Sequence, residues 1–186
     1  AVLKKAADLD IQIICPLHGP VLTENLGYYL DTYNTWSSYQ PEDDGITIAY
    51  ASVYGHLKAA VEELASALEA RGQKVSVFDL ARDDMAEAVE DAFRYDRLVL
   101  ASITYQGEIF PFMSTFIHTL AEHAYQNRTV ALVEAGSWAP AAAKVMTKEL
   151  EGMKDITLTQ NKVTVLGSLN DASRAQIEAL ADELSK

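Results

Sequence analysis

Three short segments carry residues that could bind a ligand, and each follows a run rich in β-branched residues. The first is Ser52-Val53-Tyr54-Gly55-His56-Leu57, which leads directly into a segment with helical spacing. A hydroxyl, a glycine and a helix start together form a phosphate site, because unpaired backbone N–H groups point outward there. The chain has neither GxxxxGK[ST] nor GxGxxG, so neither a nucleoside triphosphate nor a dinucleotide is indicated. The segment is therefore compatible with a site for a single phosphomonoester, although taken alone it is better explained as an ordinary βα turn.

The other two segments are richer in aromatic and amide groups. They are Ser102-Ile103-Thr104-Tyr105-Gln106-Gly107 and Gly136-Ser137-Trp138. The connection that begins at Ser102 is long for a βα loop, and loops of unusual length often have a function. The planar side chains of Tyr54, Tyr105 and Trp138 could lie against a flat heteroaromatic ring, at roughly 1 kcal/mol per contact. Each aromatic taken singly is explained by packing, but the three together favour a ring ligand.

The elements that must position these segments are of two alternating kinds, runs rich in β-branched residues and segments with helical spacing. Residues between the strand-like runs have apolar positions three or four apart, which predicts helices. The central runs are apolar on both faces, so helices must cover the sheet on both sides. Successive β-α units give a parallel sheet with right-handed crossovers, whose ligands bind beyond the carboxyl ends of the strands. We therefore expect a doubly wound, five-stranded parallel α/β sheet, with strands at residues 46–51, 74–79, 97–102, 129–135 and 162–166.

Start and stop signals accompany the predicted helices. Gly72 is a natural end for the helix that follows the first segment. Asp83 or Asp84 is a suitable N-cap for the next helix, and Pro111 a suitable first residue for the third. Asn170 or Asp171 is expected to cap the last helix.

The first forty residues do not follow this alternation. A helix at their start has no capping residue before it, and a polar stretch rich in turn formers separates them from the first strand. We therefore interpret residues 1–40 as the remnant of a preceding domain, joined to a complete domain at residues 46–186. The elements predicted before that domain are a helix at Ala1–Leu9, a strand at Ile11–Cys15, an aromatic helix at Leu26–Tyr39 and a linker at residues 41–45.

Composition excludes several classes of partner. The 186 residues include 27 acidic and 15 basic side chains, for a net charge of −12, which disfavours nucleic acid and anionic membrane surfaces. No apolar run approaches the roughly 18–20 residues that cross a bilayer, and the first ten residues lack the apolar centre of a signal peptide. Cys15 is the single cysteine, so no intrachain disulfide can form, and we expect a cytoplasmic protein.

The three segments also carry a family resemblance. The stretches YASVYGH, SITYQGEIFP and GSWAP resemble the FMN loops of the flavodoxin-like domain at the C-terminus of flavodiiron proteins, or A-type flavoproteins. Upstream, the stretch IICPLHGP at residues 13–20 resembles the end of that family's metallo-β-lactamase-like domain. The resemblance implies a flavodoxin-like sheet with strand order 2-1-3-4-5, preceded by a remnant of the di-iron domain at residues 1–40. It also implies that His18 is a di-iron ligand in the full-length context.

The same resemblance implies an activity and its site. Residues 52–57 would hold the FMN phosphate, residues 102–107 would flank one side of the ring, and residues 136–138 would form the other wall. This chain would act as a redox carrier. In full-length relatives, electrons pass from FMN to a di-iron site that reduces oxygen to water or nitric oxide to nitrous oxide. The implied partners are a rubredoxin or flavin reductase and a second copy in a head-to-tail homodimer, with di-iron present only alongside the N-terminal domain.

One departure from the family pattern supports a rival hypothesis. Leu57 stands where the family usually has a Thr or Ser whose hydroxyl binds the phosphate. A hydrogen bond to a charged group contributes roughly 1.5–3 kcal/mol, so its loss is expected to weaken FMN binding about tenfold or more. The hydroxyl of Ser52, the ring of His56 or the backbone amides would have to compensate. The rival is a flavodoxin-fold module that has lost FMN and serves dimerisation or partner docking.

Other chemistries find little support in the residues. The chain has four histidines, too few with suitable neighbours for a di-iron site of its own. His118 and Glu122 are four residues apart on a predicted helix, which we interpret as a solvated pair. A phosphorelay receiver needs acidic residues at the ends of the first and third strands, where Ala51-Ser52 and Ser102-Ile103 stand. We therefore set the receiver hypothesis aside.

Overall fold

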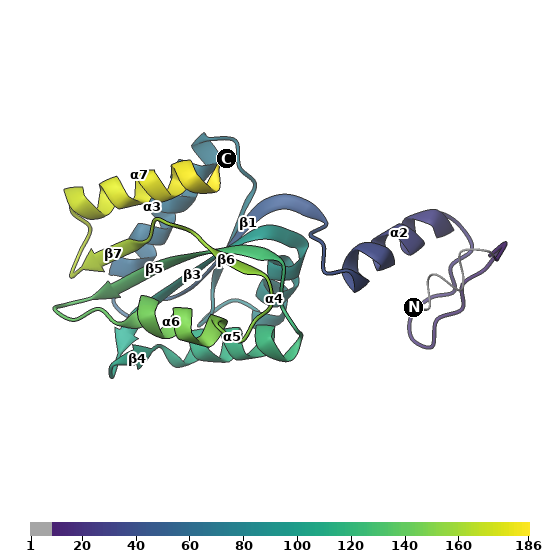
Figure 1. The fold of residues 1–186 in the computed structure, drawn as a ribbon, viewed down its shortest axis with the longest axis horizontal. Coiled ribbons are helices and arrows are strands. Elements are labelled where there is room, and N and C mark those ends of the chain that lie inside the picture. The colour runs from purple at the N-terminus through teal and green to yellow at the C-terminus, as the bar shows by residue number, and fades with distance from the viewer. Residues whose placement is uncertain (1–8) are drawn as a thin grey trace.

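The computed structural model describes residues 9–186, which form a sheet with helices on both faces and an N-terminal arm of residues 9–40 (Figure 1). The sheet has its strands in the order β2-β1-β3-β5-β6, and β7 pairs with β5 as well. All of these pairs are parallel. The bounds of the parallel strands are β1 Asp43–Ala51, β2 Val75–Asp79, β3 Tyr95–Tyr105, β5 Arg128–Gly136, β6 Ile156–Leu158 and β7 Val163–Leu166.

The predicted strand order 2-1-3-4-5 is confirmed, although two strands share the fifth position. β6 pairs with the beginning of β5 and β7 with its end. Between them, the backbone amides of Gln160 and Asn161 donate to the Glu183 carboxylate at 2.7 and 2.9 Å. Because this carboxylate takes amides that would otherwise extend the ladder, the fifth position is divided. A further strand, β4 (Glu108–Ile109), pairs antiparallel with the end of β3 and was not expected.

Helices cover both faces of the sheet, as the apolar strands require. α3 (His56–Ala70) and α7 (Asp171–Leu184) pack on one face, and α4 (Met85–Arg94), α5 (Pro111–Glu122) and α6 (Ala142–Leu150) pack on the other. The predicted caps are confirmed where Asp84 accepts from Ala86 N and Asn170 forms a capping box with Ser173. None of the helices in residues 9–186 has the length and apolar character needed to span a bilayer.

Each face of the sheet has its own apolar core. On β1, Ile46, Ile48 and Tyr50 face α3 and α7, while Ala49 and Ala51 face α4, α5 and α6. Side chains on a strand alternate between faces, so the fully apolar β1 serves both cores. Fully burying one large aliphatic side chain contributes roughly 1.5–3 kcal/mol, and these cores hold the strand ends rigidly in place.

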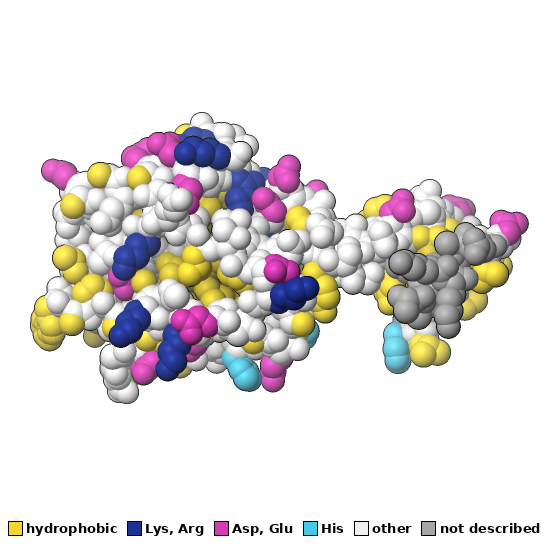
Figure 2. All heavy atoms as spheres, in the orientation of Figure 1, with side chains coloured by type: hydrophobic (Ala, Val, Ile, Leu, Met, Phe, Trp, Pro, Cys, Tyr) yellow, Lys and Arg dark blue, Asp and Glu magenta, His cyan; other side chains and the backbone are white. Residues whose placement is uncertain are grey.

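The N-terminal arm projects away from the sheet (Figure 1). The predicted strand at residues 11–15 is wrong, because Ile14 forms only an isolated bridge with Leu22 and no ladder in the described part of the arm. α2 (Leu26–Ser37) buries no side chain against the described residues, and Figure 2 shows hydrophobic side chains on the arm's surface. The helix predicted at residues 1–9 lies almost wholly outside the described residues. β1 begins at Asp43, within the stretch predicted as a linker, and the division into domains stays a prediction.

A buried arginine connects the arm to the sheet. Arg128 at the start of β5 donates from its guanidinium to the carbonyl oxygens of Tyr39, Tyr95 and Phe93 at 2.7, 2.8 and 2.5 Å. Burial lowers the pKa of this guanidinium from its ordinary value, since the charge is removed from water. The several carbonyls that it bonds supply the partners that a buried cation needs.

Candidate functional site

A cleft of about 160 Å³ lies at the carboxyl ends of β1, β3 and β5. The helix after β1 leaves on one face and the helix after β3 on the other, which makes this edge a topological switch point. Larger hollows of about 690 and 580 Å³ lie elsewhere, one at the amino edge of the strands and one beside the arm. We place the site in the smaller cleft because the switch point and the predicted segments coincide there. The cleft is lined by Ser52, Tyr54, His56, Leu57, Ile103, Thr104, Ala135, Gly136, Ser137 and Gly167.

The first segment ends in an open helix N-terminus. α3 begins at His56 after Gly55, whose φ is 86°, and this N-cap glycine has no side chain that could cap the helix. The N–H of Lys58 lies 3.4 Å from the Ser52 hydroxyl oxygen, a long hydrogen bond. A Cβ at Gly55 would meet nothing within 4 Å among the described atoms, so the space before the helix is free. Free N–H groups and the helix dipole fit a phosphate at this position.

The structure explains what Leu57 does instead of binding phosphate. Its side chain is 1% exposed and belongs to the apolar core between α3 and the sheet. Leu57 can therefore offer the anion its backbone N–H but not its side chain. Lys58 is a cationic side chain nearby, and its ammonium lies 3.7 Å from the Glu62 carboxylate. Whether the missing hydroxyl weakens FMN binding stays a prediction.

The second segment is a hairpin, not the long βα loop that the sequence suggested. Gln106 and Gly107 have φ values of 54° and 80° and connect β3 to β4, as in a two-residue type I′ turn. Ser102 is fully buried, and its hydroxyl accepts from Phe110 N and donates to Ile103 O, at 3.2 and 3.1 Å. Ile103 and Thr104 line the cleft. The ring of Tyr105 packs edge-on against the ring of Phe110, with 5.3 Å between the ring centroids.

The third segment turns sharply beside the cleft. A Cβ at Gly136 would lie 3.0 Å from Pro140 Cα, so the close return of the chain requires glycine here. Gly136 and Ser137 line the cleft, and Trp138 at the apex is 92% exposed. Tyr54 in the first segment is 87% exposed. These two aromatic side chains are free to lie against a planar ring.

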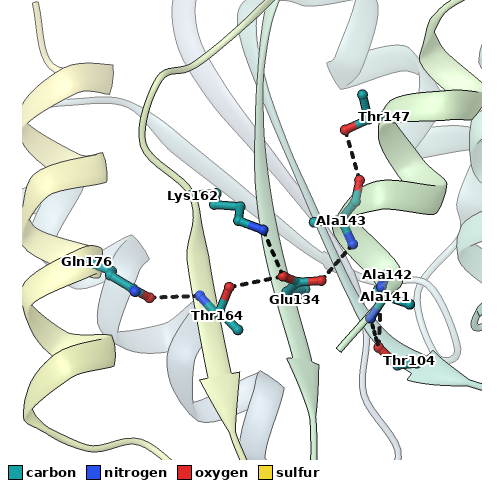
Figure 3. A network of polar contacts seen from close by, with 9 residues as sticks. All are labelled: Thr104, Glu134, Ala141, Ala142, Ala143, Thr147, Lys162, Thr164 and Gln176. Carbon is teal, nitrogen blue, oxygen red and sulfur yellow. Dashed lines mark hydrogen bonds and ion pairs between the residues drawn. The ribbon is translucent and has the colours of Figure 1, made fainter. Parts of the chain in front are cut away.

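Hydrogen bonds from two strands fix the start of α6 (Figure 3). The Thr104 hydroxyl oxygen accepts from the N–H groups of Ala141 and Ala142 at 2.9 and 3.3 Å. Glu134 accepts from Ala143 N at 2.9 Å through its second carboxylate oxygen. Thr104, predicted to flank a ring, thus also caps a helix.

Sequence reasoning missed several residues of this edge. Ala135 and Gly167 line the cleft, and Gly167 N donates to Gly136 O at 3.0 Å. The signal for Gly167 was present, because a glycine directly follows the last predicted strand. Glu134 had no such signal, since its partners are distant in the sequence. Among the predicted residues, Val53, Gly55, Ser102, Tyr105, Gln106, Gly107 and Trp138 do not line the cleft itself.

The size of the cleft limits how a ligand would fit. Pockets that enclose a whole cofactor usually measure about 300–1,000 Å³. A cleft of about 160 Å³ suits a phosphate and the chain attached to it. A ring would lie across the rim, where Tyr54 and Trp138 are exposed, so the residues present fit a phosphorylated ligand with a planar ring.

Metal chemistry has no site in the described part of the chain. No group of three or more His, Cys, Asp or Glu side chains within residues 9–186 is placed to hold an ion. His18 lies exposed in the arm. His118 Nε2 lies 3.3 Å from the Glu122 carboxylate with both side chains largely in solvent, which confirms a solvated pair.

Comparison with known proteins identifies the matching family. The family model described as a flavodoxin domain matches residues 47–171. A nitric oxide reductase of Moorella thermoacetica is 23% identical over 147 residues, covering 79% of this chain and 37% of that protein. These matches do not favour a module that has lost its flavin.

Solved structures agree on the fold. Rubredoxin oxygen:oxidoreductase from Desulfovibrio gigas superposes with a TM-score of 0.86 at 17% identity, covering 99% of this chain and 46% of that chain. The flavodiiron protein of Giardia intestinalis gives a TM-score of 0.86 at 16% identity, covering 98% of this chain and 46% of its own. The chain therefore spans less than half the length of these relatives.

Proposed function

Because this chain belongs to the flavodoxin-domain family, we propose that it binds FMN in the cleft and passes electrons to a second redox centre. The observation that carries the proposal is the N-terminus of α3, which begins after Gly55 beside a cleft at the switch point of the sheet. The family implies FMN as the cofactor, and bound FMN supplies one- and two-electron transfer. The protein's own task is to bind the phosphate, orient the ring and limit the access of water.

The first segment would hold the phosphate. Backbone N–H groups at the start of α3 offer a partial positive charge, and the free space at Gly55 lets the anion approach them. The Ser52 hydroxyl and the exposed His56 ring add polar contacts at the same end. This arrangement compensates for the absence of a hydroxyl at Leu57.

The other two segments would hold the ring. Ile103 and Thr104 form one side of the cleft, and Gly136 and Ser137 form the other. Trp138 is free to cover one edge of a ring that lies across the rim. The Gln106–Gly107 turn projects beside this edge and would shield it from water.

The whole protein would couple this domain to a di-iron site. Support comes from the relatives, which include a protein named nitric oxide reductase and one named rubredoxin oxygen:oxidoreductase. We therefore propose that the full-length protein reduces nitric oxide or oxygen, with His18 as one iron ligand. A rubredoxin-like protein or flavin reductase would donate electrons, and head-to-tail dimerisation would bring FMN of one copy near the iron of the other, in the cytoplasm.

An absorption spectrum tests the cofactor assignment. We expect purified protein to retain yellow flavin bands after incubation with FMN and desalting, because the amides at α3 hold the phosphate. Ser52→Ala and Trp138→Ala are each expected to weaken binding about threefold to tenfold, since each removes one contact. Trp36→Ala, which removes the other tryptophan, 56% exposed in the arm, is the control and should leave the affinity unchanged. A protein that stays colourless with FMN, riboflavin and FAD contradicts the proposal.

A further inference from the structure

Glu134 is a buried carboxylate immediately before the third segment. Its residue is 3% exposed, and on β5 it lies between Ser102 of β3 and Thr164 of β7. Burying a charge is costly unless hydrogen bonds and opposite charge compensate it. The Glu134 carboxylate is therefore expected to have hydrogen-bonding and charged partners.

Both oxygens of Glu134 have protein partners (Figure 3). The first accepts from the Lys162 ammonium at 3.1 Å and from the Thr164 hydroxyl at 3.0 Å. The second accepts from the backbone N–H of Ala143, in the first turn of α6, at 2.9 Å. The side chain thus joins β5, β7 and α6 at a single point.

The first turn of α6 depends on this contact because it lacks a cap of its own. Ala141 occupies the N-cap position, and alanine has no side-chain acceptor. The three N–H groups that begin the helix are accepted instead by Thr104 of β3 and Glu134 of β5. Residues on two neighbouring strands therefore determine where α6 begins.

The start of α6 in turn determines the conformation of residues 136–140. This segment runs from the end of β5 to the beginning of α6, and Gly136 touches Pro140 closely. Trp138 is 92% exposed, so within the described residues little packing holds its ring. The position of Trp138 therefore follows from the two anchored ends of the segment.

We infer that Glu134 is a positioning residue, which anchors α6 and thereby holds Trp138 beside the cleft. The carboxylate acts through Ala143 and the segment 136–140, without contacting the ligand itself. The inference deepens the proposed function, because a fixed Trp138 meets a ring ligand without the entropic cost of ordering the loop. Its first consequence, the order of Trp138, does not depend on FMN.

The order of Trp138 can be measured in the protein without FMN. The chain has two tryptophans, so Trp36→Phe leaves Trp138 as the single reporter. In that background we expect Glu134→Ala to lower the fluorescence anisotropy of Trp138 and to raise its quenching by acrylamide. Glu134→Asp keeps the charge but falls short of Ala143, and it should behave like Glu134→Ala. Glu134→Gln keeps an oxygen acceptor for Ala143 and should restore most of the anisotropy.

The matched control is a cap on α7, a helix that contributes no residue to the lining of the cleft. Asn170 caps α7 through Ser173, so Asn170→Ala removes a comparable hydrogen bond without touching the third segment. It should lower the unfolding midpoint and leave the Trp138 signal unchanged. With FMN added, Glu134→Ala should weaken the affinity about tenfold and Asn170→Ala not at all.

Two results would overturn the inference. Trp138 anisotropy in Glu134→Ala equal to that in Asn170→Ala would show that the carboxylate only stabilises the fold. Loss of anisotropy that Glu134→Gln fails to restore would show that charge, not the contact with Ala143, matters. If Glu134→Ala does not fold, Glu134→Asp carries the same comparison. Failure of the wild type to bind FMN contradicts the proposed function but leaves the anisotropy test decisive.

Discussion

Two helices begin beside the same cleft, and their N-termini are treated in opposite ways. α3 starts after Gly55, which has no side chain, and within the described residues the only side-chain acceptor at its first turn is the Ser52 hydroxyl, 3.4 Å from Lys58 N. At the start of α6, the N–H groups of Ala141, Ala142 and Ala143 are accepted by Thr104 and Glu134. A helix N-terminus attracts an anion only where the protein leaves its amides free. The comparison therefore supports α3 as the helix at which the proposed phosphate would lie, and it leaves α6 as a support for the neighbouring loop.

The charges near the two helices reinforce this difference. Glu134 places a carboxylate under the first turn of α6, where it would repel a second anion. Lys58 lies in the first turn of α3, where its positive charge would attract one. Substitutions at the two helix N-termini, and the binding of inorganic phosphate to the amides of α3, test this difference.

The largest effect is expected from placing a negative charge at the open helix. Gly55→Asp puts a carboxylate where the phosphate would lie, and two unit charges 4 Å apart repel by about 4 kcal/mol near a protein surface. We expect FMN affinity to fall about a thousandfold, measured by fluorescence titration. Riboflavin, which has no phosphate, should lose far less affinity.

The neutral variant Gly55→Asn is the control for this change. It carries the same shape and the same strain of a positive φ at 86°, but no charge. Equal losses of FMN and riboflavin affinity in Gly55→Asp would break the comparison, because the phosphate would then lie elsewhere.

Leu57→Thr tests why position 57 carries a core side chain and not a hydroxyl that would help the α3 amides to bind phosphate. The change introduces the hydroxyl of the family pattern, but it removes a large side chain that is 1% exposed in the core. Replacing a buried leucine with a smaller residue costs roughly 2–5 kcal/mol, and we expect a loss of about 3 kcal/mol in unfolding free energy by urea titration. Leu57→Met conserves the volume and should cost less than about 1.5 kcal/mol. A stable Leu57→Thr protein would contradict the role assigned to this side chain.

Thr104→Val removes the shared acceptor at α6. The valine has nearly the same shape but cannot accept from Ala141 and Ala142. Losing a cap costs roughly 0.5–2 kcal/mol, and we expect about 2 kcal/mol in the free energy of unfolding, measured by urea titration. Thr104→Ser retains the acceptor and should lose clearly less. Equal stabilities of the valine variant and the wild type would show that α6 needs no cap from β3.

Inorganic phosphate should produce the smallest effect. Phosphate that binds the free amides of α3 stabilises the folded state, by about 1.4 kcal/mol at ten times its Kd. We expect the unfolding midpoint to rise by a few degrees in a thermal scan without FMN. Sodium chloride of the same ionic strength is the control, and Gly55→Asp should abolish the rise. A rise that persists in Gly55→Asp would place the anion elsewhere.

Local patterns in the sequence predicted much of this architecture. Runs rich in β-branched residues identified the five main strands, and period-3.6 spacing identified the helices, because each element buries one face or both against its neighbours. The caps at Asp84 and Asn170 follow from side chains that bond N–H groups two or three residues away. The convergence of three segments at one edge follows from the parallel direction of the strands, whose carboxyl ends lie together.

Contacts between distant segments decided the rest. The Thr104 hydroxyl meets Ala141 across 37 residues, and the Glu134 carboxylate meets Lys162 across 28. No pattern among neighbouring residues in the sequence predicts such contacts, because they depend on which strands become neighbours in the sheet. The same is true of the division of the fifth strand position, where Glu183 of α7 takes the amides of Gln160 and Asn161.

The sequence by itself therefore determined the sheet, its helices and the edge at which we propose that a ligand binds. It also contained Gly55 and the helix start that follows it, which local rules identify as an anion site. Only the tertiary structure decided that side chains from other strands accept the first N–H groups of α6, whereas the start of α3 keeps N–H groups available. It also decided that the Leu57 side chain packs in the core. The physical reason is that neighbouring residues determine where a helix begins. Which groups accept its first N–H groups depends instead on side chains that the fold brings from other strands.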